Sequence, residues 1–486
     1  MLILNSQFSI KTKENISRLA LKAMGLFGGV QVMGIICSII RTKLVAIWIG
    51  PVGVGLFGLF NNALEMINTG TNLGIRGSSV RDISQAVASD DRSLIARIIV
   101  VVRRWSLWLG LGGALLTLLL SPLLSEVTFG TQDQMWGFVA LSIAVLLMAI
   151  SNGEQAVLQG SRRLKRLARA SVAGTVLGLL ISIPLFYWLR ERSVVPSIIA
   201  YAACNALMMW LLRNKDYPAP GVSRRETVDM GRGFVRLGIY MTVGNFVTIL
   251  AGYVFNAWLN QEAGTAVVGH YQAGYTLINK YTGLILSALG MEYYPRLAQV
   301  AGDRLRLHES VSLEISVAML VLAPVVALFV LLRGPIIWLL YSEEFTVIEA
   351  MVSWGMVGTV MRALSWCMAF VILARGDGKT YVITEAVSAT VGLVLNILFY
   401  RWWGITGLGL SFLAWYVVYT LIIGVVYFHH YRLTLSWGSA ANWLWALAVA
   451  TGVVIAMQLS CLWLAVVVAI VSMAVSALQL VKQWRS

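Results

Sequence analysis

Apolar runs of about 20 residues recur along nearly the whole length of this chain. A run of that length, wound as an α-helix, spans the ~30 Å hydrocarbon core of a bilayer. Only 12% of the 486 residues are charged, whereas a soluble domain carries roughly 25%. An outer-membrane barrel would instead show short segments of alternating hydrophobicity. The sequence therefore predicts an all-α polytopic membrane protein.

The apolar runs divide into about 14 transmembrane helices. We place them at 24–49, 52–74, 105–124, 135–158, 170–189, 194–212, 233–258, 267–291, 313–340, 347–374, 380–400, 404–428, 440–458 and 461–481. Residues 1–22 are mixed and polar, and the first apolar run is too long for the core of a cleavable signal. We expect this segment to remain on the chain.

The distribution of positive charge tests this assignment. With a cytoplasmic N-terminus, the predicted inside segments hold 29 of the 37 lysines and arginines, and the outside segments hold 4. Lysine and arginine resist translocation, so such a bias sets the orientation. A missed span would invert every later segment and destroy the alternation. We therefore predict 14 spans with both termini in the cytoplasm, and basic cytoplasmic loops explain the net charge of +15 without nucleic acid.

A short internal repeat relates the two halves of the chain. The first long span leads into VGLFGLFNNALEMIN, and the seventh leads into VGHYQAGYTLINKYTG. With an offset of 214 residues, Gly55 matches Gly269 and Phe57 matches Tyr271. Both preceding helices run from inside to outside, so the halves would be parallel repeats, as in transporters whose halves are related by an axis along the membrane normal.

Groups that would carry an enzymatic reaction are missing from the sequence. There is no HExxH motif, and the four histidines are poorly spaced for a metal. The segment RGDGKT ends like a phosphate-binding loop, but Leu373 stands where that motif needs glycine, so a cytoplasmic turn fits better. The four cysteines lie in apolar runs without CxxC spacing, as packing residues do. We expect no cofactor, and any active transport would be coupled to a proton or sodium gradient or to the substrate's own gradient.

Charged residues inside the spans are the best candidates for function. A charge at the bilayer centre costs about 2.5–3.5 kcal/mol on insertion scales, so such groups face a watery cavity or one another. The cations are Arg41, Lys43, Lys280 and Arg362, and the acidic residues within or near the ends of spans are Glu65, Glu154, Glu292, Glu314 and Glu385. Glu154, Glu292 and Glu314 lie near span ends, where snorkelling to the interface is an equally good explanation.

These cations predict a binding site for an anion. Arg41 and Lys43 lie about 200° apart around a helix, so one lines the cavity and the other pairs elsewhere; we favour Arg41 for the cavity. Lys280 and Arg362 lie in mid-span. A planar guanidinium binds phosphate oxygens in pairs, which favours a phosphate-bearing substrate.

Other groups in the spans could pair with these cations or contact the substrate. Glu65, Glu385 and Glu154 are candidate charge or coupling partners. Tyr271 and Tyr275 are candidates for stacking on sugar rings, although most aromatic residues should form interfacial belts.

The order of several blocks resembles a known family. The blocks are KAMGLFGGVQVMGIICSIIRTKLVAIWIGPVGVGLFGLFNNALEMINTGTNLGIRGSSVRDIS, MEYYPRLAQVAGD and RGPIIWLLYSEEFTVIEAMVSWGMVGTVMRALSWCMAFVILARGDGKTYVITEAVS. Together they resemble the Wzx-type O-antigen and polysaccharide flippases, a branch of the MOP exporter superfamily. The resemblance covers most of residues 20–430.

The resemblance implies two pseudo-symmetric six-helix lobes around a central cavity. Residues 1–212 would form the N-terminal lobe and 213–432 the C-terminal lobe. An extra helix pair, 433–486, departs from the twelve spans common in the family.

The implied substrate is undecaprenyl-diphosphate-linked oligosaccharide, moved from the cytoplasmic to the periplasmic leaflet of a bacterial inner membrane by alternating access. The expected partners are this lipid, the bilayer and other polysaccharide assembly proteins, with the chain acting as a monomer. Arg41 falls where related flippases carry a cavity arginine.

Three alternatives stay open. A multidrug exporter of the same superfamily would favour cationic drugs, so acidic residues should dominate its cavity. A lipid II flippase would share the mechanism and differ in the head group; the extra helix pair resembles it in number. A membrane glycosyltransferase would need a large loop with catalytic groups, whereas the longest predicted loops here have about 30 residues.

Overall fold

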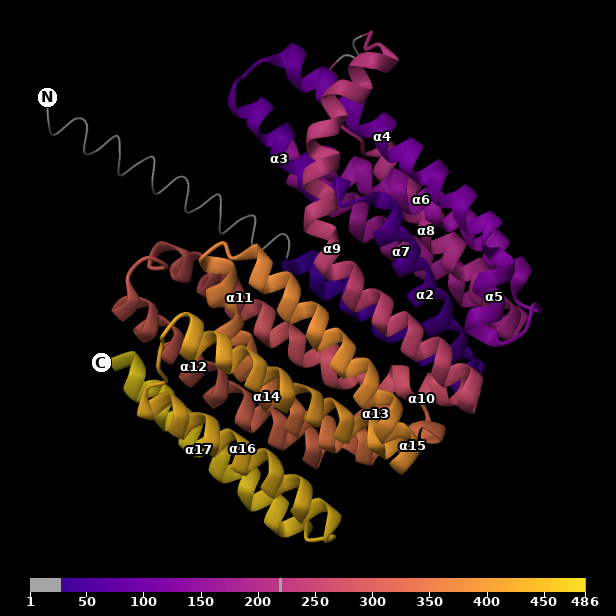
Figure 1. The fold of residues 1–486 in the computed structure, drawn as a ribbon. Helices are drawn as coiled ribbons and strands as arrows, with labels where there is room; N and C mark the ends of the chain where they lie inside the picture. Colours follow the sequence, from indigo (N-terminus) through magenta and orange to yellow (C-terminus); the bar gives the residue numbers. More distant parts are fainter. Residues whose placement is uncertain (1–27, 218–220, 486) are drawn as a thin grey trace, which may run out of the picture. The chain divides into compact units, whose positions relative to one another are not determined.

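The computed structural model describes residues 28–217 and 221–485. Residues 1–22, for which the sequence analysis makes a prediction, lie outside the described residues. In the described part every regular element is a helix, and the packing of the helices divides the chain into two compact units (Figure 1). Unit 1 comprises residues 1–49 and 60–246, and unit 2 comprises 50–59 and 247–486. The division therefore falls inside two helices, α2 and α9, and not at the predicted lobe boundary of 212/213, which stays a prediction.

Unit 1 holds the helices of the first half. They are the helix Gly28–Trp48, most of α2 (Gly50–Asn72), α3 (Ile75–Ala88), α4 (Arg92–Leu119), α5 (Ser121–Phe129), α6 (Met135–Gly160), α7 (Leu164–Leu189), the short η1 (Arg190–Ser193), α8 (Val194–Leu211) and the first part of α9 (Arg224–Ala263). The predicted cytoplasmic segment 75–104 is thus largely helical. Asp91 starts α4 by accepting hydrogen bonds from the backbone N–H groups of Ser93 and Leu94, as an N-cap does.

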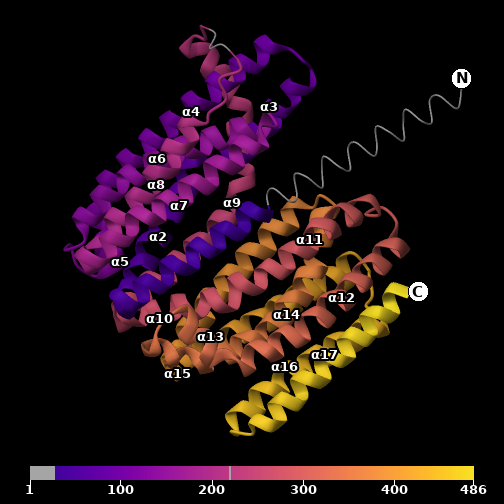
Figure 2. The same cartoon turned by 180° about the vertical axis from the view of Figure 1, so that it is seen from behind.

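Unit 2 holds the helices of the second half. They are the rest of α9, α10 (Thr265–Tyr275), the π-helical η2 (Thr276–Tyr281), α11 (Thr282–Gln299), α12 (Arg304–Leu331), α13 (Arg333–Leu340), η3 (Glu343–Ile348), α14 (Glu349–Ala374), α15 (Gly378–Val425), η4 (Val426–His430), α16 (Trp437–Gln458) and α17 (Leu462–Arg485). The first part of α2, residues 50–59, also belongs to this unit. The last two helices lie side by side and pack on α12, as both views show (Figures 1 and 2).

The described helices are consistent with about 14 spans. Nine of them are long and apolar enough to cross a bilayer, and α4 with α5 makes a tenth, bent by 62°. Two of the nine, 164–211 and 378–430, have 48 and 53 residues, too long for one crossing of ~30 Å. The second is broken at Gly404, which adopts φ 57° inside α15. Adding α2 and the α10–α11 pair, which are more polar, completes fourteen, and the chain is a multi-pass membrane protein.

The core of unit 2 is centred on α14. Small and apolar residues cover most of its surface. Within Glu343–Ala374, 72% of the most apolar stretch of 18 residues is buried inside the protein. It packs against α12, α15 and α16. A helix that is apolar on all sides is a central helix, so any polar residue on α14 must face a cavity or a polar partner.

Candidate functional site

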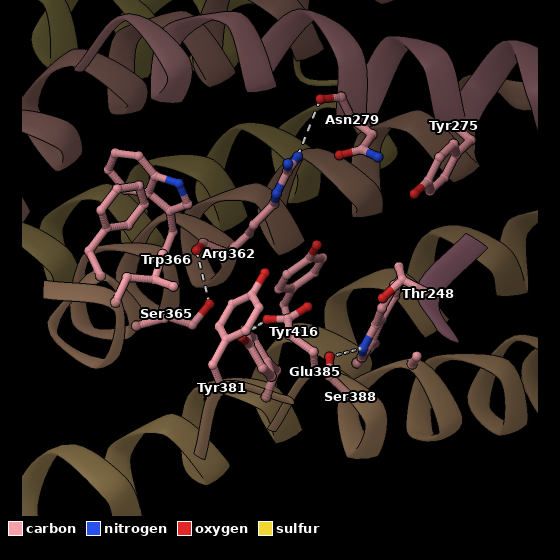
Figure 3. Close-up of a pocket in the computed structure, with 16 residues that line it drawn as sticks. Thr248, Tyr275, Asn279, Arg362, Ser365, Trp366, Tyr381, Glu385, Ser388 and Tyr416 are labelled. Atoms are coloured by element: carbon pink, nitrogen blue, oxygen red, sulfur yellow. Dashed lines mark hydrogen bonds between the residues drawn. The ribbon is translucent and has the colours of Figure 1, made fainter. Parts of the chain in front are cut away.

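A cavity of about 390 Å3 lies within unit 2 (Figure 3). Helix α14 supplies the cation Arg362, and α15 supplies the acid Glu385. Tyr275 and Asn279 contribute from α10 and η2, and Thr248 contributes from α9. The remaining wall is formed by Ser365, Trp366, Ala369, Phe370, Leu373, Tyr381, Ser388, Ala389, Trp415, Tyr416 and Tyr419. The volume falls within the usual range for small-ligand sites, and the lining combines many aromatic rings with a few polar groups, as such sites do.

Arg362 is held by two contacts that leave part of its donor set available. Its Nη1 donates to the backbone oxygen of Asn279 at 3.2 Å, and its guanidinium carbon lies 5.8 Å from the ring centroid of Tyr416 (Figure 3). A guanidinium has five N–H donors in a planar fork. The π-helical turn η2 carries Asn279, and such turns often occur at functional sites. Asn279 Oδ1 is buried and has no hydrogen-bond partner among the described residues.

Glu385 lines the same cavity but is bound to a different partner. Its Oε1 accepts a hydrogen bond from the hydroxyl of Tyr419 at 2.7 Å. The cavity therefore contains one cation and one anion, each with a neutral partner. This arrangement leaves the guanidinium able to receive an anionic ligand.

The aromatic wall of the cavity is fixed in place by small residues behind it. Trp415 donates from Nε1 to the Ser388 hydroxyl at 3.0 Å, and its ring stacks on Tyr416 with centroids 5.2 Å apart. A Cβ at Gly392 would lie 2.6 Å from Cε2 of Trp415, so glycine is required for the indole to pack there. A preformed flat wall of this kind offers stacking surface to a planar or ring-shaped ligand.

Comparison with known protein families shows the family to which this chain belongs. The family model described as "Polysaccharide biosynthesis protein" matches residues 83–350, more than half of the 486 residues. The chain belongs to the polysaccharide biosynthesis protein family. Two curated relatives, each named "Lipid III flippase", come from Escherichia coli strain K12 and Shigella flexneri. Each is 24% identical over 400 residues, covering 79% of this chain and 92% of the relative.

Solved structures show which fold this polysaccharide biosynthesis protein adopts. The inward closed conformation of the lipid II flippase MurJ matches with a TM-score of 0.70 and 11% identity, covering 95% of this chain and 100% of that one. An inward-facing MATE family multidrug transporter of the MOP superfamily matches with a TM-score of 0.68 and 15% identity, covering 87% and 96%. The expected MOP fold is confirmed. These relatives are flippases and transporters, in agreement with the prediction of a transporter and not an enzyme.

Only some of the residues predicted from the sequence meet at the cavity of this family member. Arg362, Glu385 and Tyr275 line it together. Tyr271 is buried instead, with its ring centroid 5.0 Å from that of Phe255. Lys280 is exposed on η2 and is not among the lining residues.

Three of the residues predicted from the sequence, Arg41, Lys43 and Glu65, belong to unit 1. The guanidinium carbon of Arg41 lies 5.3 Å from the ring centroid of Tyr201 on α8. Lys43, two positions on, is half-buried, and Glu65 is exposed on α2.

Glu154 has a partner that the sequence did not suggest. It is 5% exposed and forms two hydrogen bonds with Arg103 of α4, at 2.6 Å from Nε and 2.9 Å from Nη2. Arg103 also donates to the backbone oxygen of Asn214 at 3.1 Å. In this structure Glu154 is a charge partner of Arg103 and joins α4 to α6.

The segment RGDGKT forms a turn that starts a helix. Gly376 has φ +69°, and Asp377 accepts hydrogen bonds from the Thr380 hydroxyl and backbone N–H at 2.7 and 3.1 Å. The Thr380 hydroxyl, with its backbone N–H, holds the pKa of Asp377 below its usual range. The carboxylate occupies the start of α15, so the segment is a helix cap, as a turn predicts.

Several lining residues were missed by reading the sequence. They are Asn279, Trp366, Tyr381, Trp415, Tyr416 and Tyr419. One signal could have found part of the set: Tyr381, Glu385 and Ser388 follow one another at spacings of four and three, so they share one face of α15. No comparable spacing marks Trp415 and Tyr416, and because Trp and Tyr are enriched in interfacial belts, their residue type alone does not indicate a cavity.

Proposed function

We propose that this protein is a flippase for undecaprenyl-diphosphate-linked oligosaccharide, of the Wzx type, moving it from the cytoplasmic to the periplasmic leaflet of the inner membrane by alternating access. The observation that carries the proposal is Arg362, a cation on a buried membrane helix that lines an aromatic cavity. A phosphate oxygen needs the donors of a guanidinium, and sugar rings fit flat aromatic faces.

Family membership and the names of the relatives support the substrate class. The chain belongs to a polysaccharide biosynthesis family, and its curated relatives are named lipid III flippases. In unit 2 the diphosphate would contact Arg362, and the adjoining sugar would lie against Tyr416 and Trp415. Arg41 of unit 1 is a second candidate for the phosphate, and Lys43 and Lys280 are weaker ones.

The direction of transport follows from where the substrate is made. Sugar transfer to a lipid diphosphate uses activated sugars of the cytoplasm, so the site must open to that side first. The cations replace part of the hydration that the diphosphate loses on leaving water, while the polyprenyl chain stays in lipid. Each cycle then releases the diphosphate-linked sugar on the other side.

Replacement of Arg362 tests the proposal. In a strain lacking the gene, we expect the Arg362→Ala protein to lower surface polysaccharide and raise lipid-linked intermediate. Loss of a charge-assisted hydrogen bond of about 1.5–3 kcal/mol corresponds to about a 10- to 100-fold loss of affinity. Arg362→Lys should retain partial function, since it keeps the charge and loses the fork. Arg375→Ala is the matched control, because Arg375 follows the same helix but lies outside the cavity, against Tyr431.

One observation favours a second function, the ion-coupled multidrug exporter. Glu385 lies in the same cavity and would attract a cationic drug. The two functions separate in the same strain. Drug sensitivity of the deletion, reversed by the wild-type protein but not by Glu385→Gln, together with normal surface polysaccharide, would favour the exporter and exclude the flippase.

A further inference from the structure

A second group of ionisable side chains lies in unit 2, where α11 packs against α12. Glu314 of α12 is only 4% exposed, and its Oε2 accepts a hydrogen bond from Nη2 of Arg296 at 2.7 Å. Nε of Arg296 lies 3.1 Å from Oε1 of Glu292, one turn earlier on α11, whose side chain is 70% exposed. One guanidinium thus donates a hydrogen bond to a buried carboxylate and forms an ion pair with an exposed one, while its Nε has no hydrogen-bond partner of good geometry among the described residues.

One oxygen of the buried carboxylate receives no hydrogen bond from the described residues. Glu314 Oε1 is buried and has no hydrogen-bond partner among the described residues. The hydroxyl of Ser310, one turn earlier on the same face of α12, is also buried without a partner. With both carboxylates ionised, the three charged groups carry a net charge of −1. An unsatisfied charged oxygen away from water is costly, and a bound proton removes that cost.

Protonation of Glu314 would still leave Arg296 with one ionised carboxylate partner. A buried pair is normally costly to break because the remaining charge has no partner. Here Arg296 keeps Glu292, which is on its own helix, when it loses Glu314. The proton therefore removes the ionic attraction that links α11 to α12, and it does so without creating an unpaired cation.

Few other ionisable groups surround this carboxylate. From α11, Tyr293 lies beside Arg296 and donates from its hydroxyl to the backbone oxygen of Cys367 on α14 at 2.8 Å. Cys367 of α14 and Tyr427 of η4 are the other ionisable groups close enough to interact electrostatically with this cluster. The sequence of α16 contains no ionisable residue, and the described ionisable side chain of α17 is Lys482, near its end. Arg296 and Glu292 are thus the charges that decide the state of Glu314.

The helix that would be released leads directly to the cavity. α11 continues η2 without a break, and η2 contains Asn279, whose backbone oxygen receives Arg362. We propose that Glu314 binds a proton during the transport cycle and thereby uncouples α11 from α12. Its place in that cycle rests on the proposed function, whereas proton binding itself does not. Glu314 is thus a further candidate for coupling, beside Glu65 and Glu385, on different grounds.

Infrared difference spectroscopy of the purified full-length protein in liposomes tests proton binding without any substrate. On lowering the pH, we expect the carbonyl-stretch band of a buried protonated carboxylic acid, and its loss in Glu314→Gln. Glu292→Gln should shift the band to lower pH, because Arg296 then has no second carboxylate and a neighbouring negative charge is removed. Glu309→Gln, an exposed carboxylate on the same helix, should leave the band unchanged.

A band that persists in Glu314→Gln, or that sodium at constant pH removes, would overturn the proposal. Thermal unfolding of each variant shows whether it is folded. If Glu314→Gln does not fold, Glu314→Asp provides a carboxylate at the same position, and this variant should show the band. In the same liposomes, a lipid-linked diphosphate oligosaccharide reports translocation. A Glu314-dependent band without translocation would contradict the flippase and leave the proton site standing.

Discussion

Gly55 of α2 and Gly269 of α10 pack against each other, backbone to backbone. A Cβ on Gly55 would overlap the carbonyl oxygen of Thr265 and lie 3.0 Å from the nitrogen of Gly269. A Cβ on Gly269 would overlap the carbonyl oxygen of Pro51 and lie 3.0 Å from the nitrogen of Gly55. Both pairs, Gly55 with Gly269 and Pro51 with Thr265, are separated by 214 residues. The contact is therefore reciprocal between equivalent positions of the internal repeat, as expected at a local two-fold axis.

Replacement of either glycine should be damaging. In Gly55→Ala the added methyl group meets backbone atoms that cannot rotate away, so we expect destabilisation of about 1–3 kcal/mol or more, together with loss of transport. Thermal unfolding in detergent and surface polysaccharide measure the two effects. Gly112→Ala is the control, since no atom lies within 4 Å of its added Cβ. Equal stability of the two variants would contradict a tight crossing at Gly55.

The buried pair of Arg103 and Glu154 should matter more than an exposed pair on the same helix. Arg103→Ala leaves Glu154 buried without its cation, which costs about 3–5 kcal/mol. Arg97 lies 3.6 Å from Glu226 with 53% of its side chain exposed, so Arg97→Ala should cost at most ~1 kcal/mol. Thermal unfolding of the two purified variants measures the difference, and similar melting temperatures would show that the Arg103 pair is not structural.

The charge of Glu385 should oppose binding of an anion. Glu385→Gln removes a negative charge from the cavity of Arg362, so binding of a lipid-linked diphosphate sugar in liposomes should be unchanged or tighter, and the return of the empty carrier slower. Tyr419→Phe removes the 2.7 Å hydrogen bond and keeps the charge, so it should not tighten binding. The underlying hypothesis is that the carboxylate pairs with a cavity cation in the empty carrier and that the diphosphate displaces it. Weaker binding in Glu385→Gln would contradict this exchange, and Glu65→Gln is tested in the same way, independently.

The predicted orientation can be measured directly. Reporters fused after Arg169, Gly221 and Arg306 should be cytoplasmic, and reporters after Gln132 and Glu343 periplasmic. The reason is the predicted 29-to-4 division of lysine and arginine. Gln132 lies between α5 and α6, and Glu343 begins η3. A well-expressed fusion with the opposite location would require a different number of spans.

The sequence by itself determined the helices and the resemblance between the halves. Apolar runs of fixed length report which segments leave water, and each such segment must become a helix because its backbone has no other partner in lipid. The same reasoning identified Arg362 and Glu385 as charges within spans, and matched Gly55 with Gly269. It predicted a span from residue 105, whereas the helix α4 already begins at Arg92, because a helix can continue beyond the apolar segment.

Only the tertiary structure decided which groups meet. Hydrophobic periodicity reports that a side chain is buried, but not what lies opposite, because partners come from helices far apart in the chain. The sequence therefore predicted Glu154 as a charge or coupling partner without its cation, and the fold shows that this cation is Arg103, 51 residues away. Likewise Arg362 and Tyr416 lie on different helices, and their shared cavity exists only once α14 and α15 have packed.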